Sequence, residues 1–143
     1  MATKRHAHTV WEGNLTEGKG TVSLDYSGLG SYEVSWPARS EEATGRTSPE
    51  ELIAAAHSSC YCMAFSGALA KGGTPPTRLT AKAEVTFVPG TGITTVHLTV
   101  EGEVPGIDEG TFLKTAEEAK ANCPVSKALA GTEITLTASL VTS

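Results

Sequence analysis

The segment from residue 52 to residue 69 carries no charge except the one that His57 can acquire on protonation. Directly before it, Ser48-Pro49-Glu50-Glu51 has the pattern of a helix start, with a serine cap, a proline in the first turn and a glutamate at the capping-box position. We therefore predict a helix from Pro49 to about Ala70, which ends before Gly72. Because small and apolar residues lie on all of its sides, we predict that this helix is the buried spine of the fold, covered by a sheet or by a partner subunit.

Short runs of alternating apolar and polar residues flank this helix on both sides, and alternation of this kind is typical of β-strands. Three strands are expected before the helix and three after it, with a polar loop over 37–47 and two further helices. The expected positions are strands near Trp11 and over 20–26, 32–36, 79–87, 96–100 and 134–140, a helix over 109–122 and a short helix from Cys123 to about Leu129. The order βββ-α-ββ-α-β predicts an α+β fold with mostly antiparallel hairpins, in a single domain over residues 1–143.

Composition excludes several classes of protein. A net charge of −5 argues against a nucleic-acid binder, which usually carries a basic patch. The longest apolar run, Leu52–Ala56, is too short to cross a membrane, and no apolar region follows Lys4 and Arg5 as in a signal peptide. Three cysteines are too few for a disulfide scaffold, so we expect a cytoplasmic protein whose cysteines are catalytic, metal-binding or inert.

The three cysteines differ in their settings. Cys60 and Cys62 lie two positions apart in the predicted helix, about 200° around its axis, so their side chains should face opposite ways. Cys123 precedes Pro124, where it can cap the short helix, and the positive end of that helix favours a thiolate. A purely structural role as a buried small residue is the alternative for each of them.

Other candidate residues have equally plain alternatives. His57-x-x-Cys60-x-Cys62 contains three possible metal ligands, but the helix turns Cys62 away from Cys60, so we expect no metal and no cofactor. Glu50 is an acid in a first helical turn, where the helix dipole alone favours it. Arg39 and Arg46 can likewise be ordinary charged residues of a solvated loop.

Two cysteine motifs resemble those of the OsmC/Ohr family. The stretch from Thr47 to Cys60 is similar to the central-helix motif of this family, and Asn122-Cys123-Pro124-Val125-Ser126-Lys127-Ala128-Leu129 is similar to its second cysteine motif. The opening Trp11-Glu12-Gly13-Asn14 with residues 18–22 also fits, so the resemblance covers nearly the whole chain. His57 and the stretch Val104-Pro105-Gly106-Ile107-Asp108 look like the osmotically inducible OsmC branch.

The resemblance implies a thiol-dependent peroxidase that reduces organic hydroperoxides, and hydrogen peroxide less effectively, in oxidative or osmotic stress. It implies an intertwined homodimer with active sites at the subunit interface and a dithiol reductant, such as a dihydrolipoyl group. Cys60 then resembles the peroxidatic cysteine, Cys123 the resolving cysteine and Glu50 the acid of the family. Arg39 resembles the loop arginine, with Arg46 as a rival for that role.

Several alternatives stay open at this point. Along a straight helix Glu50 lies about 15 Å from Cys60, so the helix breaks, Arg39 spans the gap, or Glu50 serves the cysteine of the other subunit. Cys62 departs from the family pattern and is either a structural residue or a spare thiol. The same fold could also serve a non-catalytic small-molecule or lipid-binding dimer, or a redox-sensing stress protein. Candidates for an apolar peroxide pocket are Ala56, Met63, Phe65 and Phe112.

Overall fold

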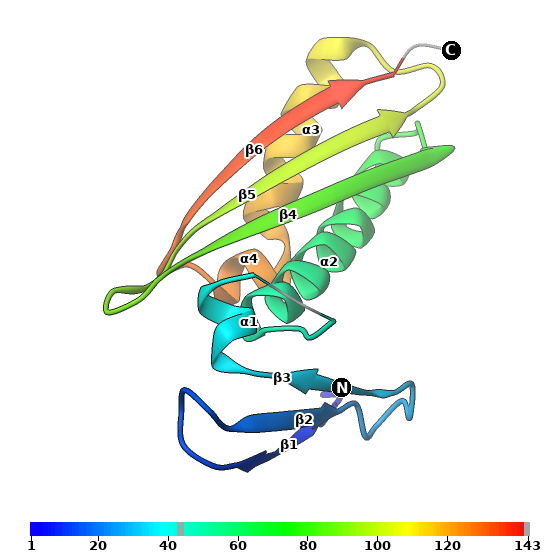
Figure 1. Cartoon of the computed structure of the whole chain (residues 1–143). Helices are drawn as coiled ribbons and strands as arrows, with labels where there is room; N and C mark the ends of the chain where they lie inside the picture. Colours follow the sequence, from blue (N-terminus) through cyan, green and yellow to red (C-terminus); the bar gives the residue numbers. More distant parts are fainter. Residues whose placement is uncertain (43–44, 142–143) are drawn as a thin grey trace. The chain divides into compact units, whose positions relative to one another are not determined.

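A computed structural model describes residues 1–42 and 45–141, which form two compact units with a boundary between Leu52 and Ile53 (Figure 1). The predicted α+β order is confirmed, with one added helix. The elements are β1 (His8–Glu12), β2 (Lys19–Ser23), β3 (Ser31–Val34), α1 (Trp36–Ser40), α2 (Pro49–Lys71), β4 (Arg78–Val88), β5 (Gly92–Glu103), α3 (Glu109–Asn122), α4 (Pro124–Ala128) and β6 (Glu133–Leu140).

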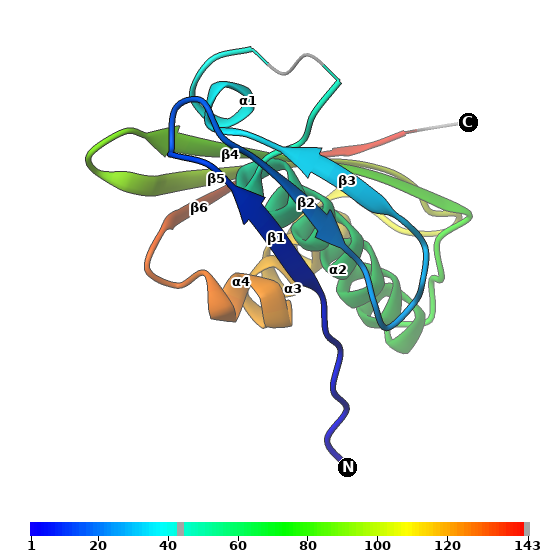
Figure 2. The same cartoon turned by 60° about the horizontal axis from the view of Figure 1, so that its bottom comes forward.

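The first unit is built on a small antiparallel sheet in the order β1-β2-β3 (Figure 2). The second strand ends at Ser23, not near Tyr26 as predicted. The chain turns there because the N–H of Leu24 donates to the carbonyl of Gly30 and the N–H of Gly28 to that of Leu24. Gly28 has a φ of 69°, which a residue with a side chain rarely adopts. Alternation alone did not reveal this turn.

The third strand is also shorter than predicted, because Trp36 begins the short helix α1. The Ser35 hydroxyl accepts a hydrogen bond from the N–H of Ala38 at 3.2 Å, and Pro37 occupies the first turn. A serine with a proline two residues later can begin a helix as well as end a strand. The predicted polar loop over 37–47 is therefore helical up to Ser40, and residues 43 and 44 of it lie outside the described residues.

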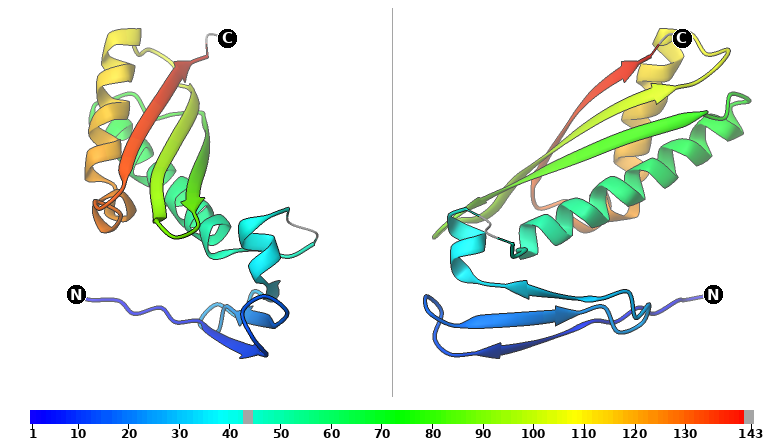
Figure 3. Two further views of the ribbon diagram at one scale, coloured as in Figure 1. Left: turned by 60° about the vertical axis from the view of Figure 1, so that its left-hand side comes forward. Right: turned by 45° about the vertical axis from the view of Figure 1, so that its right-hand side comes forward.

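The second unit contains the sheet β4-β5-β6, and α2 and α3 cover one face of it (Figures 1 and 3). β4 and β5 form the predicted antiparallel hairpin, whereas β6 pairs with β5 in parallel. A parallel pair needs a crossover connection, which α3 and α4 provide. The predicted cap of α3 is confirmed, since the Asp108 carboxylate accepts a hydrogen bond from the N–H of Thr111.

The core of the second unit lies between this sheet and the two helices. Most of its buried residues come from three elements, and they are Tyr61, Phe65 and Leu69 of α2, Leu98 and Val100 of β5, and Phe112, Ala116 and Ala119 of α3. The ring centroids of Phe65 and Phe112 lie 5.2 Å apart. A Cβ atom at Gly102 would lie 2.7 Å from the Phe112 ring, so glycine is required where α3 approaches β5. Phe65 and Phe112 are therefore core residues and do not line a peroxide pocket, contrary to the prediction.

Helix α2 is buried on one side only. It runs without a break through all of its 23 residues, as predicted. His57, Tyr61, Phe65 and Leu69 form its buried stripe, whereas Met63 on another side is 74% exposed. By length and hydropathy alone α2 could cross a membrane, and core helices of soluble proteins meet the same criterion. Only 22% of its most apolar window is buried within the chain, and Met63 is among the residues left exposed.

Candidate functional site

Two cysteines that are far apart in the sequence meet in the second unit. Cys60 lies in the middle of α2, and Cys123 lies between α3 and α4. Their thiols are near enough to influence each other's ionisation, and both are free, with no disulfide between them. Cys60 is partly exposed, whereas Cys123 is completely buried. A molecule arriving from solvent can therefore approach Cys60 more easily than Cys123.

The two thiols have different electrostatic environments. Burial raises the pKa of Cys60, and its hydrogen bond to Cys123 adds to this, although the N–H of Val125 opposes it. Burial acts in the same way on Cys123, but it is outweighed by interactions with the N–H of Ser126, the Cys60 thiol and the Ser126 hydroxyl. These interactions hold the pKa of Cys123 below its ordinary value. The predicted effect of the α4 start on Cys123 agrees with this direction. Within one chain, Cys123 is thus the more easily ionised thiol.

A buried histidine lies next to this pair. The Nε2 atom of His57 is 2.7 Å from the hydroxyl of Ser126, and the His57 side chain is fully buried. Burial lowers the pKa of His57, so the ring is neutral at neutral pH. A continuous series of polar interactions therefore runs from α2 to α4 and back, through His57, Ser126, Cys123 and Cys60.

Cys62 has a separate environment. Burial raises the pKa of its thiol, and the backbone of Ala81 in β4 lowers it slightly. Cys60 instead interacts with Val125 and Cys123. The prediction that the two side chains of α2 face different surroundings is confirmed.

An arginine and a glutamate form a tight ion pair in the first unit. The Nε atom of Arg39 donates to both carboxylate oxygens of Glu50 at 3.0 and 3.1 Å, and Nη2 donates to Oε2 at 3.0 Å. Glu50 is buried, and such bidentate contacts fix the plane of the guanidinium group. Arg46, the rival candidate, lies 3.8 Å from the more exposed Glu33. Of the two arginines, Arg39 is therefore the one held in a fixed position.

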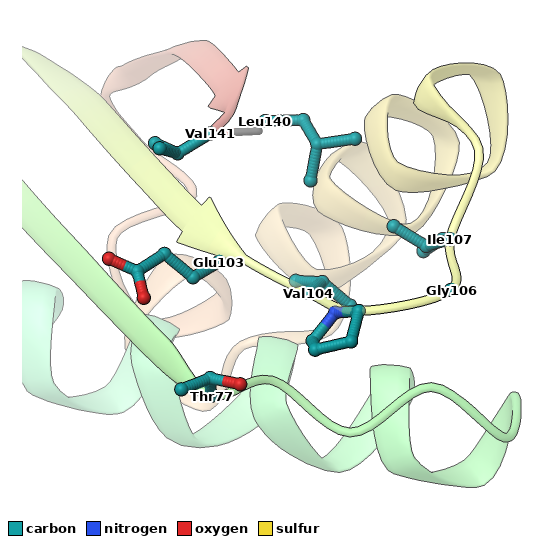
Figure 4. Close-up of a pocket in the computed structure, with 8 residues that line it drawn as sticks. Thr77, Glu103, Val104, Gly106, Ile107, Leu140 and Val141 are labelled. Atoms are coloured by element: carbon teal, nitrogen blue, oxygen red, sulfur yellow. The ribbon is translucent and has the colours of Figure 1, made fainter. Parts of the chain in front are cut away.

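Cavities occur in both units. In the first unit a cavity of about 370 Å³ adjoins Arg39, and its walls include the apolar residues Trp11, Leu15, Val34, Trp36 and Leu52. In the second unit a cavity of about 420 Å³ lies near the end of β6 and is lined by Thr77, Glu103, Val104, Ile107 and Leu140 among others (Figure 4). No cysteine lines this second cavity, so it is not placed for thiol chemistry. Among residues 1–42 and 45–141, no cluster of three potential metal ligands occurs.

The second unit thus holds two neighbouring free thiols, one partly exposed and one buried, and the pKa of the buried thiol is lowered. The family described as OsmC-like protein matches residues 41–139. The chain is 43% identical to Peroxiredoxin OsmC of Escherichia coli K12 over 139 residues, which cover 95% of this chain and 96% of that protein. The chain belongs to the OsmC family, as its motifs predicted.

Solved structures share the fold. An organic hydroperoxide resistance protein from Elizabethkingia anophelis is 26% identical and superimposes with a TM-score of 0.74, covering 99% of this chain and 100% of that one. An OsmC-like protein from Mycoplasma pneumoniae covers the same shares with a TM-score of 0.76 at 16% identity, which establishes similarity of fold alone. The full-length match to a peroxiredoxin, together with the paired thiols, makes the chain a peroxidase.

Sequence analysis did not single out Ser126 as a functional residue. The residue is part of the second cysteine motif, three positions after Cys123, where a helix N-terminus points its N–H groups toward the cap. Its spacing from a capping cysteine is a pattern that could have identified it. Its contact with His57, 69 residues away, could not be inferred from spacing.

Proposed function

We propose that the protein reduces organic hydroperoxides, and hydrogen peroxide more weakly, through Cys60 as the peroxidatic and Cys123 as the resolving cysteine. The contact between an accessible Cys60 thiol and a fully buried Cys123 thiol carries this proposal. The accessible sulfur can meet the peroxide, and the buried sulfur is in place to react next. Oxidative or osmotic stress is the setting that the family suggests.

Two steps follow from this arrangement. The Cys60 thiolate attacks one peroxide oxygen, the O–O bond breaks, and the alkoxide leaves with a proton as an alcohol, which converts Cys60 to a sulfenic acid. The Cys123 sulfur then attacks the Cys60 sulfur, an S–S bond forms, and the S–O bond breaks with loss of water. A dithiol returns the disulfide to two thiols by exchange. We propose a dihydrolipoyl-type dithiol and a reducing, cytoplasmic setting for this exchange.

Arg39 is the proposed cation for the Cys60 thiolate, with Glu50 as the residue that orients it. Cys60 needs such a cation because burial raises the pKa of its thiol. The same guanidinium group would stabilise the charge that develops on the leaving oxygen. The unbroken α2 removes a helix break as the explanation for the separation of Glu50 and Cys60. Two explanations of this separation are left. Either the Arg39–Glu50 pair acts on the Cys60 of a second subunit, or the Arg39 side chain itself spans the distance.

Measured turnover tests this function. The full chain is mixed with cumene hydroperoxide and dihydrolipoamide, and peroxide loss is followed against the same mixture without protein. Catalytic consumption, faster with cumene hydroperoxide than with hydrogen peroxide, is the expected result. Absence of turnover with lipoyl, thioredoxin and glutathione reductants would overturn the proposal and favour a ligand-binding or redox-sensing protein on the same fold.

The proposed homodimer makes a separate prediction. A second copy of the chain would cover the exposed side of α2, where Met63 is 74% exposed. Met63→Glu should then convert the dimer to monomers, because a carboxylate without a partner in an apolar interface costs roughly 3 kcal/mol or more, about a hundredfold in the dissociation constant. Sedimentation equilibrium at several concentrations measures this change.

Leu29→Glu is the matched control, since Leu29 is 78% exposed in the turn between β2 and β3, away from α2 in the sequence. It should leave the dimer intact. A wild-type protein that sediments at the mass of one chain, or a Met63→Glu protein that dimerises like wild type, contradicts the proposal.

A further inference from the structure

The hydroxyl of Ser126 interacts with two groups of the thiol site, the His57 ring and the Cys123 thiol. It is 2.7 Å from Nε2 of His57. Ser126 also follows Cys123 by three residues at the start of α4, and its hydroxyl favours the thiolate form of Cys123. A hydroxyl has a single proton, so it can donate to only one of them at a time. The tautomer of His57 decides which one.

His57 has one ring nitrogen with a partner and one without. Among the described residues, its buried Nδ1 has no hydrogen-bond partner. A buried N–H group without an acceptor is rare and costly in folded proteins, so the proton of the neutral ring belongs on Nε2. Nε2–H therefore donates to the Ser126 oxygen, and the Ser126 proton is left to point at the Cys123 sulfur. His57 orients Ser126 in this way.

We propose that Ser126, held by His57, is a positioning residue that directs its hydroxyl proton at the Cys123 sulfur and thereby controls how readily Cys123 attacks oxidised Cys60. The proposal rests on the roles proposed above for the two cysteines. It adds a polar pair to the resolving step, whereas Arg39 and Glu50 concern the first step.

The resolving step balances with these groups in place. Cys123 enters as a thiolate that has lost its proton to solvent, and its electron pair forms the S–S bond. The S–O bond of the Cys60 sulfenic acid breaks, and the leaving hydroxide takes up one proton from solvent, which replaces the proton that Cys123 released, and becomes water. Ser126 keeps its own proton throughout and stabilises the thiolate before it reacts. Cys60 and Tyr61 of α2 are titratable groups that also interact with Cys123.

Removal of the hydroxyl should change the pH dependence of this step in a characteristic way. A hydrogen bond to a charged acceptor shifts an ionisation equilibrium by about tenfold. Ser126→Ala should therefore contain about tenfold less Cys123 thiolate at neutral pH. A more basic thiolate is also a better nucleophile, by about threefold for this shift. The net result is about threefold slower disulfide formation at neutral pH, and up to threefold faster formation at a pH where Cys123 is ionised in both proteins.

The test measures disulfide formation in single turnovers. Reduced full-length protein is mixed with one equivalent of cumene hydroperoxide, quenched with acid at increasing times, alkylated, and analysed by mass spectrometry for the Cys60–Cys123 disulfide across a range of pH. Rates for wild type and Ser126→Ala should cross as pH rises. A variant that is damaged in packing alone would be slower at every pH.

Three further variants sharpen the comparison. Ser126→Thr keeps the hydroxyl and should restore the wild-type pH profile, and His57→Gln keeps a donor without a titrating ring and should stay close to it. Ser139→Ala removes an exposed hydroxyl of β6 and should have no effect.

Failure of this inference is distinguishable from failure of the proposed function. If wild type forms the Cys60–Cys123 disulfide and Ser126→Ala forms it with the same pH profile, the positioning role is wrong and the peroxidase mechanism stands. If wild type forms no such disulfide, the proposed cysteine roles fail, and the role of Ser126 fails with them.

Discussion

Replacement of Cys60 by serine is expected to lower consumption of cumene hydroperoxide by more than about a thousandfold, as loss of a covalent nucleophile does in other enzymes. Cys60 is the partly exposed member of the thiol pair, and Cys123 behind it is fully buried, so no second sulfur of the pair can replace it at the surface. Peroxide loss with dihydrolipoamide in excess measures the effect. Cys62→Ser is the matched control and should stay within about twofold of wild type, because Cys62 contacts β4 and not the pair.

Cys123→Ser should behave differently from Cys60→Ser in the same assay. The first turnover should occur, because Cys60 is intact, but recycling through the intramolecular disulfide should stop. Cys60 then remains a sulfenic acid exposed to further peroxide and proceeds to the sulfinic acid, which mass spectrometry detects. Full turnover by Cys123→Ser, or loss of activity in Cys62→Ser equal to that in Cys60→Ser, contradicts the assignment of the two sulfur roles.

Arg39→Ala should lower kcat/KM at neutral pH by about a hundredfold, the usual size of the effect when one donor to a developing negative charge is removed. Without the cation the pKa of Cys60 rises further above its ordinary value, because burial already raises it. A raised thiol pKa means that activity is lost at neutral pH and returns as the pH increases. The rising limb of the pH profile should therefore move to higher pH, and steady-state rates across pH measure this shift.

Two related variants separate charge from geometry. Arg39→Lys keeps the charge but cannot make the bidentate contact with Glu50, so an intermediate loss is expected. Arg46→Ala is the control, since Arg46 faces the exposed Glu33 at 3.8 Å. Equal losses in Arg39→Ala and Arg46→Ala, or an unchanged pH profile in Arg39→Ala, would reject the proposed role of the Arg39–Glu50 pair.

Local patterns in the sequence predicted the elements well where one interaction determines them. The serine cap and the uncharged run define α2 almost to the residue, and Asp108 defines the start of α3. Inward positions of β5 are also correct, with Val96, Leu98 and Val100 fully buried. These features depend on capping and periodicity, which act over a few residues.

Features that depend on contacts between distant residues were harder to predict from the sequence. The burial of α2 on one side only could not be inferred, because its residues are small or apolar all round and the pattern does not show which side the chain covers. The polar run from Pro37 onward was expected to be a loop, so α1, which begins at Trp36, was not predicted. The pairing of Arg39 with Glu50 depends on that helix. The contact between His57 and Ser126 depends on the whole crossover from β5 to β6.

The meeting of Cys60 and Cys123 has a topological consequence. The chain between them contains β4, β5 and α3, so a bond between the two sulfurs would close this stretch into a covalent ring with two linear tails. A ring occupies less space than an open chain once the fold is lost. The oxidised protein would thus remain distinguishable from the reduced protein after denaturation. Electrophoretic mobility in a denaturing gel without reductant would therefore show, on the unfolded chain, whether the protein had reacted with peroxide.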